Sequence, residues 1–128
     1  MLIEKYRKGL VGDKDYNCAE KVVNLANEVW ELGIAAESLK MAAGFGAGLG
    51  CGQLCGAIAA AAMIISVKNV KTVAKASQLY AIERSMVEEV EKRLGSLQCS
   101  ELKAKFYHPE SKCEFIIETV IEILDDYR

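Results

Sequence analysis

Cysteine is the residue of this sequence best suited to chemistry, and the chain has five of them: Cys18, Cys51, Cys55, Cys99 and Cys113. Disulfide frameworks belong mainly to secreted chains, and the charged first ten residues lack the apolar stretch of a signal peptide. Thiols that gather in an intracellular protein more often bind a metal or carry out redox chemistry. We therefore expect a cytoplasmic protein whose function lies in its thiols.

The segments between the cysteines predict an all-α fold. Apolar residues recur with helical spacing, and no stretch shows the alternation of a half-buried strand. One core suffices for a chain of this length, so we expect residues 1–128 to form a single-domain helical bundle. The expected helices cover residues 17–33, 37–43, 54–67, 72–94, 101–106 and 112–126.

Several local signals set the bounds of these helices. Asn17 is expected to cap the first long helix, with Glu20 completing a capping box, and Gly95 is expected to end the long amphipathic helix. Residues 54–67 are apolar on every side, which predicts a buried central helix. A glycine-rich loop precedes this helix, because five glycines at alternate positions between 44 and 52 disfavour helix.

Four of the cysteines lie in or beside the first turn of an expected helix: Cys18, Cys55, Cys99 and Cys113. Unpaired backbone N–H groups at a helix start favour a thiolate, so we expect these thiols to have lowered pKa values. The return of the chain through the long helix can bring all four to one end of the bundle. The sequence therefore predicts a shared thiol site there.

The pattern of the cysteines and glycines resembles that of a known family. Asn17-Cys18-Ala19, the run of residues 44–52 and Cys55-Gly56-Ala57, followed by Cys99 and Cys113, are similar to the motifs of the C_GCAxxG_C_C family of redox-active proteins. The resemblance covers nearly the whole chain. It implies that Cys18, Cys55, Cys99 and Cys113 are the family cysteines and that Cys51 is additional. Ala60 stands where the motif has its closing glycine.

This resemblance implies redox activity, and a related domain in split-Soret cytochromes is associated with an iron–sulfur centre. We expect Cys18, Cys55, Cys99 and Cys113 to bind an iron–sulfur cluster for electron transfer or redox sensing. Backbone N–H groups of the glycine-rich environment, at Gly50, Gly52 and Gly56, are expected to face the cluster. Zinc is the less favoured metal, because the paired C-x-x-C spacing of zinc modules is absent.

Two alternatives need no redox metal. Cys51 and Cys55 are four positions apart and could exchange between dithiol and disulfide, although a regular helix often denies them the geometry of a bridge. Alternatively, the protein is a structural or ligand-carrying helical module whose thiols are inert core residues or hold a bracing zinc ion. Rapid alkylation of the thiols would contradict the inert interpretation.

Composition narrows the choice of partners. The formal charge is −2, and the basic residues are interleaved with acidic ones, so a nucleic-acid partner is not expected. The apolar run of residues 55–67 is too short to cross a bilayer, so we expect no membrane insertion. A redox partner protein is expected, and a homodimer is a further hypothesis. No general acid–base pair stands out, so no catalysed reaction is assigned.

We expect the aromatic residues and the single histidine to have mainly structural roles. Trp30, Tyr80 and Phe115 are expected to fill the core, and Phe45 in the glycine-rich loop could pack over a bound group. His108 precedes the only proline and is interpreted as a surface turn residue, with a metal ligand or proton carrier as the alternative.

Overall fold

The computed structural model describes residues 1–128, and its regular secondary structure is entirely helical, as predicted. The seven α-helices, with the irregular turns between them, follow in chain order: α1 (Leu2–Arg7), α2 (Cys18–Val29), α3 (Ala36–Leu39), a 3₁₀ turn (Lys40–Phe45), a wide turn (Gly48–Gly52), α4 (Gly56–Asn69), a 3₁₀ turn (Ala74–Ala76), α5 (Leu79–Leu94), α6 (Cys99–Phe106) and α7 (Glu114–Asp125).

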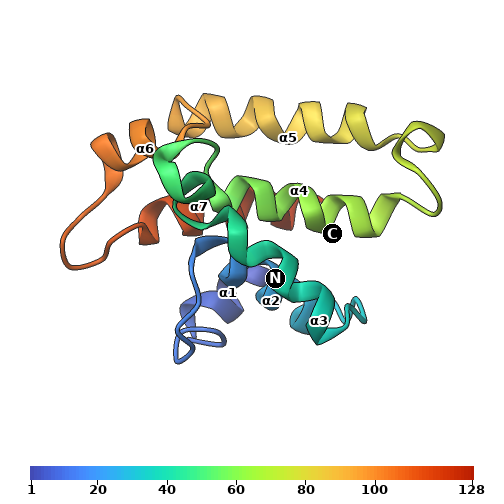
Figure 1. The fold of residues 1–128 in the computed structure, drawn as a ribbon, viewed down its shortest axis with the longest axis horizontal. Helices are drawn as coiled ribbons and strands as arrows, with labels where there is room; N and C mark the ends of the chain where they lie inside the picture. Colours follow the sequence, from blue (N-terminus) through green and yellow to red (C-terminus); the bar gives the residue numbers. More distant parts are fainter.

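Helix α4 is the centre of the bundle. It packs along α2 on one side and against α5 and α7 on others, and eight of its residues are buried. Figure 1 shows α4 and α5 running antiparallel, with α1, α2 and α3 on the opposite side of α4. A helix that is apolar all round can only be stable when neighbours cover every face. The surrounding helices thus bury most of α4 as the sequence predicts, but Val67, near the end of the helix, is 49% exposed.

The candidate site lies at the end of the bundle where α4 begins. Helix α6 and the connection from α6 to α7 lie at this end, beside the wide turn of residues 48–52 (Figure 1). A single antiparallel bridge between Leu54 and Gln98 joins the chain just before α4 to the chain just before α6. The starts of these two helices are therefore fixed side by side.

Three helix ends differ from the sequence-based prediction by four residues or more. Helix α3 ends at Leu39 and not at residue 43, because the chain continues as a 3₁₀ turn. Helix α2 ends at Val29 and not at residue 33, because Glu31 takes a left-handed conformation (φ 49°) and the Asn27 side chain bonds both backbone groups of Ile34. Helix α5 begins at Leu79 and not at residue 72. The segment before it forms only a short 3₁₀ turn, and Val73, which lies within the range expected to be helical, is 60% exposed.

Helix α1 is absent from the sequence-based prediction. Its six residues bury Leu2, Ile3 and Tyr6 against α7 and α2. The Asp125 carboxylate, at the end of α7, accepts hydrogen bonds from the backbone N–H groups of Leu2 (2.7 Å) and Ile3 (3.1 Å). Because this cap comes from the far end of the chain, no local sequence pattern announces it.

Two of the three aromatic residues expected in the core are on the surface. Tyr80 is 61% exposed and Phe115 is 53% exposed, although Ile116, Val120, Ile123 and Leu124 of α7 are buried. The Phe115 ring instead packs on Phe106, with centroids 5.1 Å apart. Trp30 is partly buried against the core, and the Lys68 ammonium lies 4.2 Å from the centre of its ring.

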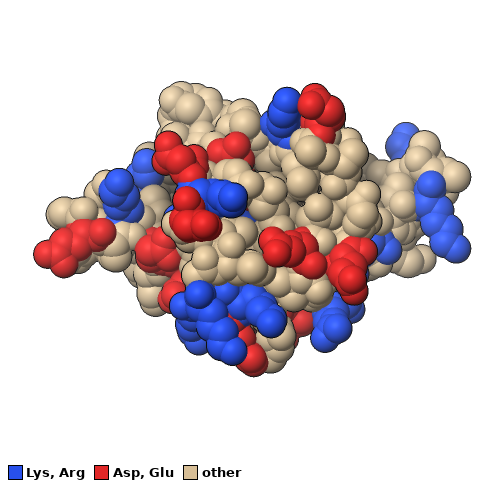
Figure 2. All heavy atoms as spheres, turned by 90° about the horizontal axis from the view of Figure 1, so that it is seen from below, with Lys and Arg blue, Asp and Glu red and all other residues tan.

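The outer surface carries charges of both signs. Figure 2 shows lysine and arginine side chains interspersed with aspartate and glutamate on one face. No helix is both long and apolar enough to cross a membrane.

Candidate functional site

Each of four cysteines sits at the start of a different helix. Cys18 and Cys99 are the first residues of α2 and α6, and Cys55 and Cys113 are the residues immediately before α4 and α7. The predicted placement of these four thiols at helix starts agrees with the structure.

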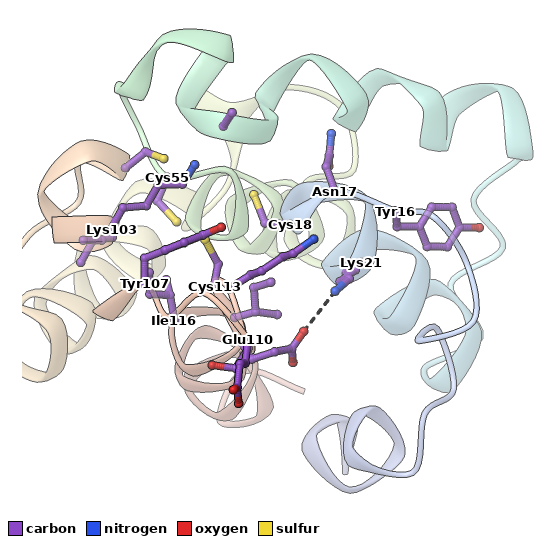
Figure 3. Close-up of a pocket in the computed structure, with 17 residues that line it drawn as sticks. Tyr16, Asn17, Cys18, Lys21, Cys55, Lys103, Tyr107, Glu110, Cys113 and Ile116 are labelled. Atoms are coloured by element: carbon purple, nitrogen blue, oxygen red, sulfur yellow. Dashed lines mark hydrogen bonds and ion pairs between the residues drawn. The ribbon is translucent and has the colours of Figure 1, made fainter. Parts of the chain in front are cut away.

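The same four cysteines line one cavity of about 460 Å³ (Figure 3). Cys55 and Cys99 are buried, whereas Cys18 and Cys113 are half-buried. Apart from Ala47, the other lining residues come from the segment before and within α2, from the α6–α7 connection and from the inner faces of α6 and α7. The structure thus brings together four residues that are up to 95 positions apart in the sequence.

Cys51 lies outside this group. Its side chain is exposed, it does not line the cavity, and its Sγ donates to the carbonyl oxygen of Gly48 at 3.7 Å. All five thiols are free in the structure. The proposed pairing of Cys51 with Cys55 would therefore join a surface thiol to a buried one.

Backbone hydrogen bonds hold Cys55 and Cys99 next to each other. The Cys55 N–H donates to the Leu97 carbonyl (2.9 Å), and the Cys99 N–H donates to the Gln53 carbonyl (2.6 Å). These bonds flank the Leu54–Gln98 bridge. These backbone bonds fix the two segments that carry Cys55 and Cys99 side by side.

Cys18 is held by the cap of α2. The Asn17 side chain accepts from the Glu20 N–H (2.9 Å) and the Glu20 carboxylate accepts from the Asn17 N–H (3.0 Å), which forms the predicted capping box. The Asn17 amide also donates to the Ala43 carbonyl (3.0 Å), at the turn before the glycine-rich segment. This cap therefore ties the start of α2, with Cys18, to the loop that leads to Cys55.

Glycine is required where the chain segments meet around the thiols. A Cβ atom on Gly56 would lie 2.6 Å from the Phe45 carbonyl oxygen and 2.7 Å from Cys18 Sγ. A Cβ atom on Gly48, which has φ +61°, would lie 2.6 Å from the Cys99 Cβ. Both contacts are far inside van der Waals distance, so only glycine allows these approaches.

The glycines predicted to face a cofactor take different positions. Gly56 borders Cys18, but Gly52 lies against Ser100 and Gly50 has open space around it, and none of the three lines the cavity. Ala47, at the start of the wide turn, does line the cavity, and its backbone is left-handed (φ 54°). No sequence signal distinguishes Ala47 from its neighbours.

Burial, and not the helix start, dominates the electrostatics of two thiols. Desolvation raises the pKa of Cys55 to about 11, although hydrogen bonds from the Ile58 and Ala57 N–H groups act in the opposite direction. Desolvation also raises the pKa of Cys113, against the lowering effect of the nearby Lys103 ammonium. The expectation of lowered pKa values is therefore wrong for Cys55 and Cys113, because transfer out of water costs the thiolate more than the helix start restores.

The four thiols also affect one another. The charge of an ionised Cys18 or Cys99 raises the pKa of both Cys55 and Cys113. Loss of one proton thus makes the loss of the next harder. Several of these thiols can therefore be ionised together only when a cation binds among them.

A polar network at the cavity wall is absent from the sequence-based prediction. The Glu114 carboxylate accepts from the Tyr6 hydroxyl (2.7 and 2.9 Å) and pairs with the Lys21 ammonium at 3.1 Å. Burial, followed by this carboxylate, raises the pKa of Tyr6 far above its usual value of 10.0. The network links α1, α2 and α7, which only the tertiary structure places together.

His108 and Phe45 are not part of the cavity wall. The His108 ring is exposed, and its Nδ1 accepts the backbone N–H of Glu110 at 3.4 Å, in the turn that precedes α7. Phe45 packs against the core. No three histidine, cysteine, aspartate or glutamate side chains are grouped closely enough to surround one metal ion.

Comparison with known proteins agrees with the geometry. Residues 16–127 match the model of a family described as "Putative redox-active protein (C_GCAxxG_C_C)". No curated protein and no solved structure matches the chain. The family match begins just before Cys18 and ends after α7, so it includes every residue that lines the cavity.

Proposed function

Because this chain belongs to the C_GCAxxG_C_C family of redox-active proteins, we propose that its four cavity cysteines hold an iron–sulfur cluster for electron transfer or redox sensing. One observation carries the proposal: Cys18, Cys55, Cys99 and Cys113, from the starts of four helices, line a single cavity. Four cysteine ligands are the usual donor set of two-iron and four-iron clusters.

The chemistry of the donor set suits such a centre. Four thiols share the cavity with apolar side chains of α6 and α7, namely Leu102, Ile116 and Ile117, which are buried and exclude water. The buried Cys55 keeps its proton at neutral pH unless a cation replaces it, since its pKa is about 11. Iron is such a cation, and the partial positive charges of the helix starts favour the thiolate centre that it forms.

A cluster does not require its four thiols to surround a single point. A single zinc ion needs at least three protein donors around one point, whereas a cluster distributes its cysteine ligands over several iron atoms. Gly56 and Gly48 allow the chain to approach Cys18 and Cys99 closely, so these two thiols stay at the cavity wall. A bound cluster would accept and release one electron at a time.

The metal-free alternative receives less support. Disulfide exchange starts from a thiolate, and at neutral pH little of Cys55 is ionised, because burial raises its pKa to about 11. Its intended partner, Cys51, is exposed outside the cavity. A cluster uses the four cavity thiols without requiring Cys51.

Iron and acid-labile sulfide content, measured with a visible absorption spectrum on protein purified without oxygen, tests the proposal. We expect iron and sulfide in the wild type, and a loss of both in Cys55→Ser and Cys113→Ser. Cys51→Ser is the matched control and should load normally, because Cys51 lies outside the cavity. Far-UV circular dichroism establishes that each variant is folded.

Two results would contradict this function. Zinc without sulfide would identify a structural metal site. Absence of any metal from anaerobically purified and chemically reconstituted protein would leave thiol–disulfide exchange or inert thiols.

A further inference from the structure

The outer part of the cavity carries charged side chains that are not ligands of the proposed cluster. The residues that line the cavity divide by exposure: Cys55, Cys99 and the apolar side chains are buried, whereas Lys103, Tyr107 and Lys112 are exposed at the mouth. Figure 3 shows Lys103 and Tyr107 extending across the mouth beside the cysteines. The outer part is therefore formed mainly by the end of α6 and the connection to α7.

Two ammonium groups at this mouth have no carboxylate partner. The ion pairs of the structure include Lys21 with Glu114, but neither Lys103 nor Lys112. Glu114 is thus already neutralised, and it also accepts from Tyr6. Glu110 is the remaining carboxylate of the cavity wall. Two unpaired ammonium groups face one unpaired carboxylate, which leaves the mouth positive.

The backbone of the α6–α7 connection is shaped to present Lys112. The backbone groups of His108 and Lys112 bond each other in both directions and close the intervening turn. Lys112 has a left-handed backbone (φ 55°), an unfavourable conformation for a residue with a long side chain.

Two hydroxyl groups at the mouth are free donors. Tyr107 and Ser111 both line the cavity, and neither side chain takes part in a hydrogen bond within the protein. An ammonium pair with adjacent hydroxyls is a donor set that suits a carboxylate or another small oxyanion. The volume of about 460 Å³ lies in the range of small-molecule sites, about 300–1,000 Å³.

We propose that the mouth of this cavity binds a small anion of carboxylate type, through Lys103 and Lys112, in front of the four thiols. This proposal rests on the proposed function in one respect: if the thiols hold a cluster, the bound anion lies next to that cluster. The starts of α2, α4, α6 and α7 add partial positive charge from the inner side.

Iodoacetate and iodoacetamide, applied to the reduced metal-free protein, test this site. The two reagents alkylate thiolates in the same way, but only iodoacetate carries a negative charge. The ratio of their rates at one cysteine is independent of the pKa of that thiol, since both react with the same thiolate. Rates at Cys18 and Cys113 are measured by peptide mass spectrometry, and the exposed Cys51 is the internal reference.

We expect the iodoacetate to iodoacetamide ratio at Cys113 to exceed the ratio at Cys51 by about fivefold or more, the effect of one unit charge at contact distance in water. The iodoacetate rate at Cys113 should also saturate with concentration, as binding before reaction requires. Lys103→Gln and Lys112→Gln should each lower the ratio, and Glu110→Gln should raise it.

Lys105→Gln is the matched control, because the Lys105 ammonium belongs to the same helix but lies near Gly95, away from the cavity. Equal ratios at Cys113 and Cys51 would overturn the proposal. An iodoacetate rate at Cys113 that rises linearly with concentration would also overturn it, as would an equal effect of Lys105→Gln. Either result would indicate that the charge of the protein surface attracts iodoacetate without a binding site.

The outcome is separable from that of the cluster experiment. Lys103→Gln and Lys112→Gln remove no thiol, so they should load iron and sulfide as the wild type does. Failure of the alkylation test with normal loading would reject the anion site alone. Anion preference in a protein that never loads iron would retain the site and reject the cluster.

Discussion

Cys18 and Gly56 are in direct contact across the interface of α2 and α4: a Cβ atom added to Gly56 would lie 2.7 Å from Cys18 Sγ. The same atom would lie 2.6 Å from the Phe45 carbonyl oxygen. One missing side chain thus lets two helix starts and the intervening turn converge on the thiol cavity.

Gly56→Ala is expected to destabilise the protein by ~1–3 kcal/mol, the usual cost of overpacking a well-packed interior. The backbone must move, since neither the carbonyl nor the start of α4 can yield separately. Urea denaturation measures the effect. Gly44→Ala is the control: its Cβ would meet no atom within 4 Å and its φ is not positive. An equally small effect of both variants would mean that the Gly56 contact is not tight.

Asp125→Asn should release α1 from the end of α7. The carboxylate accepts from two backbone N–H groups of α1, and loss of a charged cap costs ~1 kcal/mol. Amide hydrogen exchange within residues 2–7 should accelerate, while exchange within α4 changes little. Asp126→Asn is the neighbouring control, because Asp126 makes no side-chain hydrogen bond or ion pair to α1. Unchanged exchange in α1 would contradict the cap.

Tyr6→Phe should cost ~2 kcal/mol of unfolding free energy at pH 7, because its hydroxyl donates to the charged Glu114. Tyr16→Phe is a milder control, since the Tyr16 hydroxyl makes one long bond, 3.4 Å, to Asn24. Denaturant titration of the two variants compares them. Equal losses would show that the Glu114 network adds nothing beyond an ordinary surface hydrogen bond.

Stability of the reduced metal-free protein should fall as the pH rises above 9. The folded state raises the pKa of Cys55 from 9.0 to about 11, so the folded protein holds this proton more tightly than the unfolded chain. The contribution is complete below pH 9 and is lost as the pH rises through about 11, and it is on the order of 2 kcal/mol.

Unfolding free energies at pH 8 and pH 11 measure this effect. Cys55→Ala should reduce the difference between the two pH values, and Cys51→Ala should leave it unchanged. Cys113 and Tyr6, whose folded-state pKa values are also raised, retain a slope of the same sign in both variants. A difference unaltered by Cys55→Ala would contradict the burial of a neutral thiol at this position.

Much of the fold follows from signals that act within one or two helical turns. The Asn17–Glu20 capping box begins α2 as predicted, and Gly95 ends α5 in a left-handed conformation (φ 84°). Most of the apolar run of residues 54–67 lies buried at the centre of the bundle. These features were predictable because caps, glycines and apolar periods exert their effects on neighbouring residues.

Surface positions of large apolar residues were harder to predict. Tyr80 belongs to α5, which uses only part of its circumference to contact α4 and α7, and it lies on the exposed part. Phe115 pairs with Phe106 at the surface instead of entering the core. Composition alone does not state how wide the buried stripe of a helix is.

The sequence by itself determined most of the helices, the glycine-rich turn and the position of four thiols at helix starts. Only the tertiary structure decided that the thiols share one cavity, that Lys103 and Lys112 stand at its mouth, and that burial keeps Cys55 and Cys113 protonated. The physical reason is the distance along the chain over which each effect acts. Helix starts depend on adjacent residues, whereas desolvation and the field inside a cavity are sums over segments that meet only when the whole chain has folded.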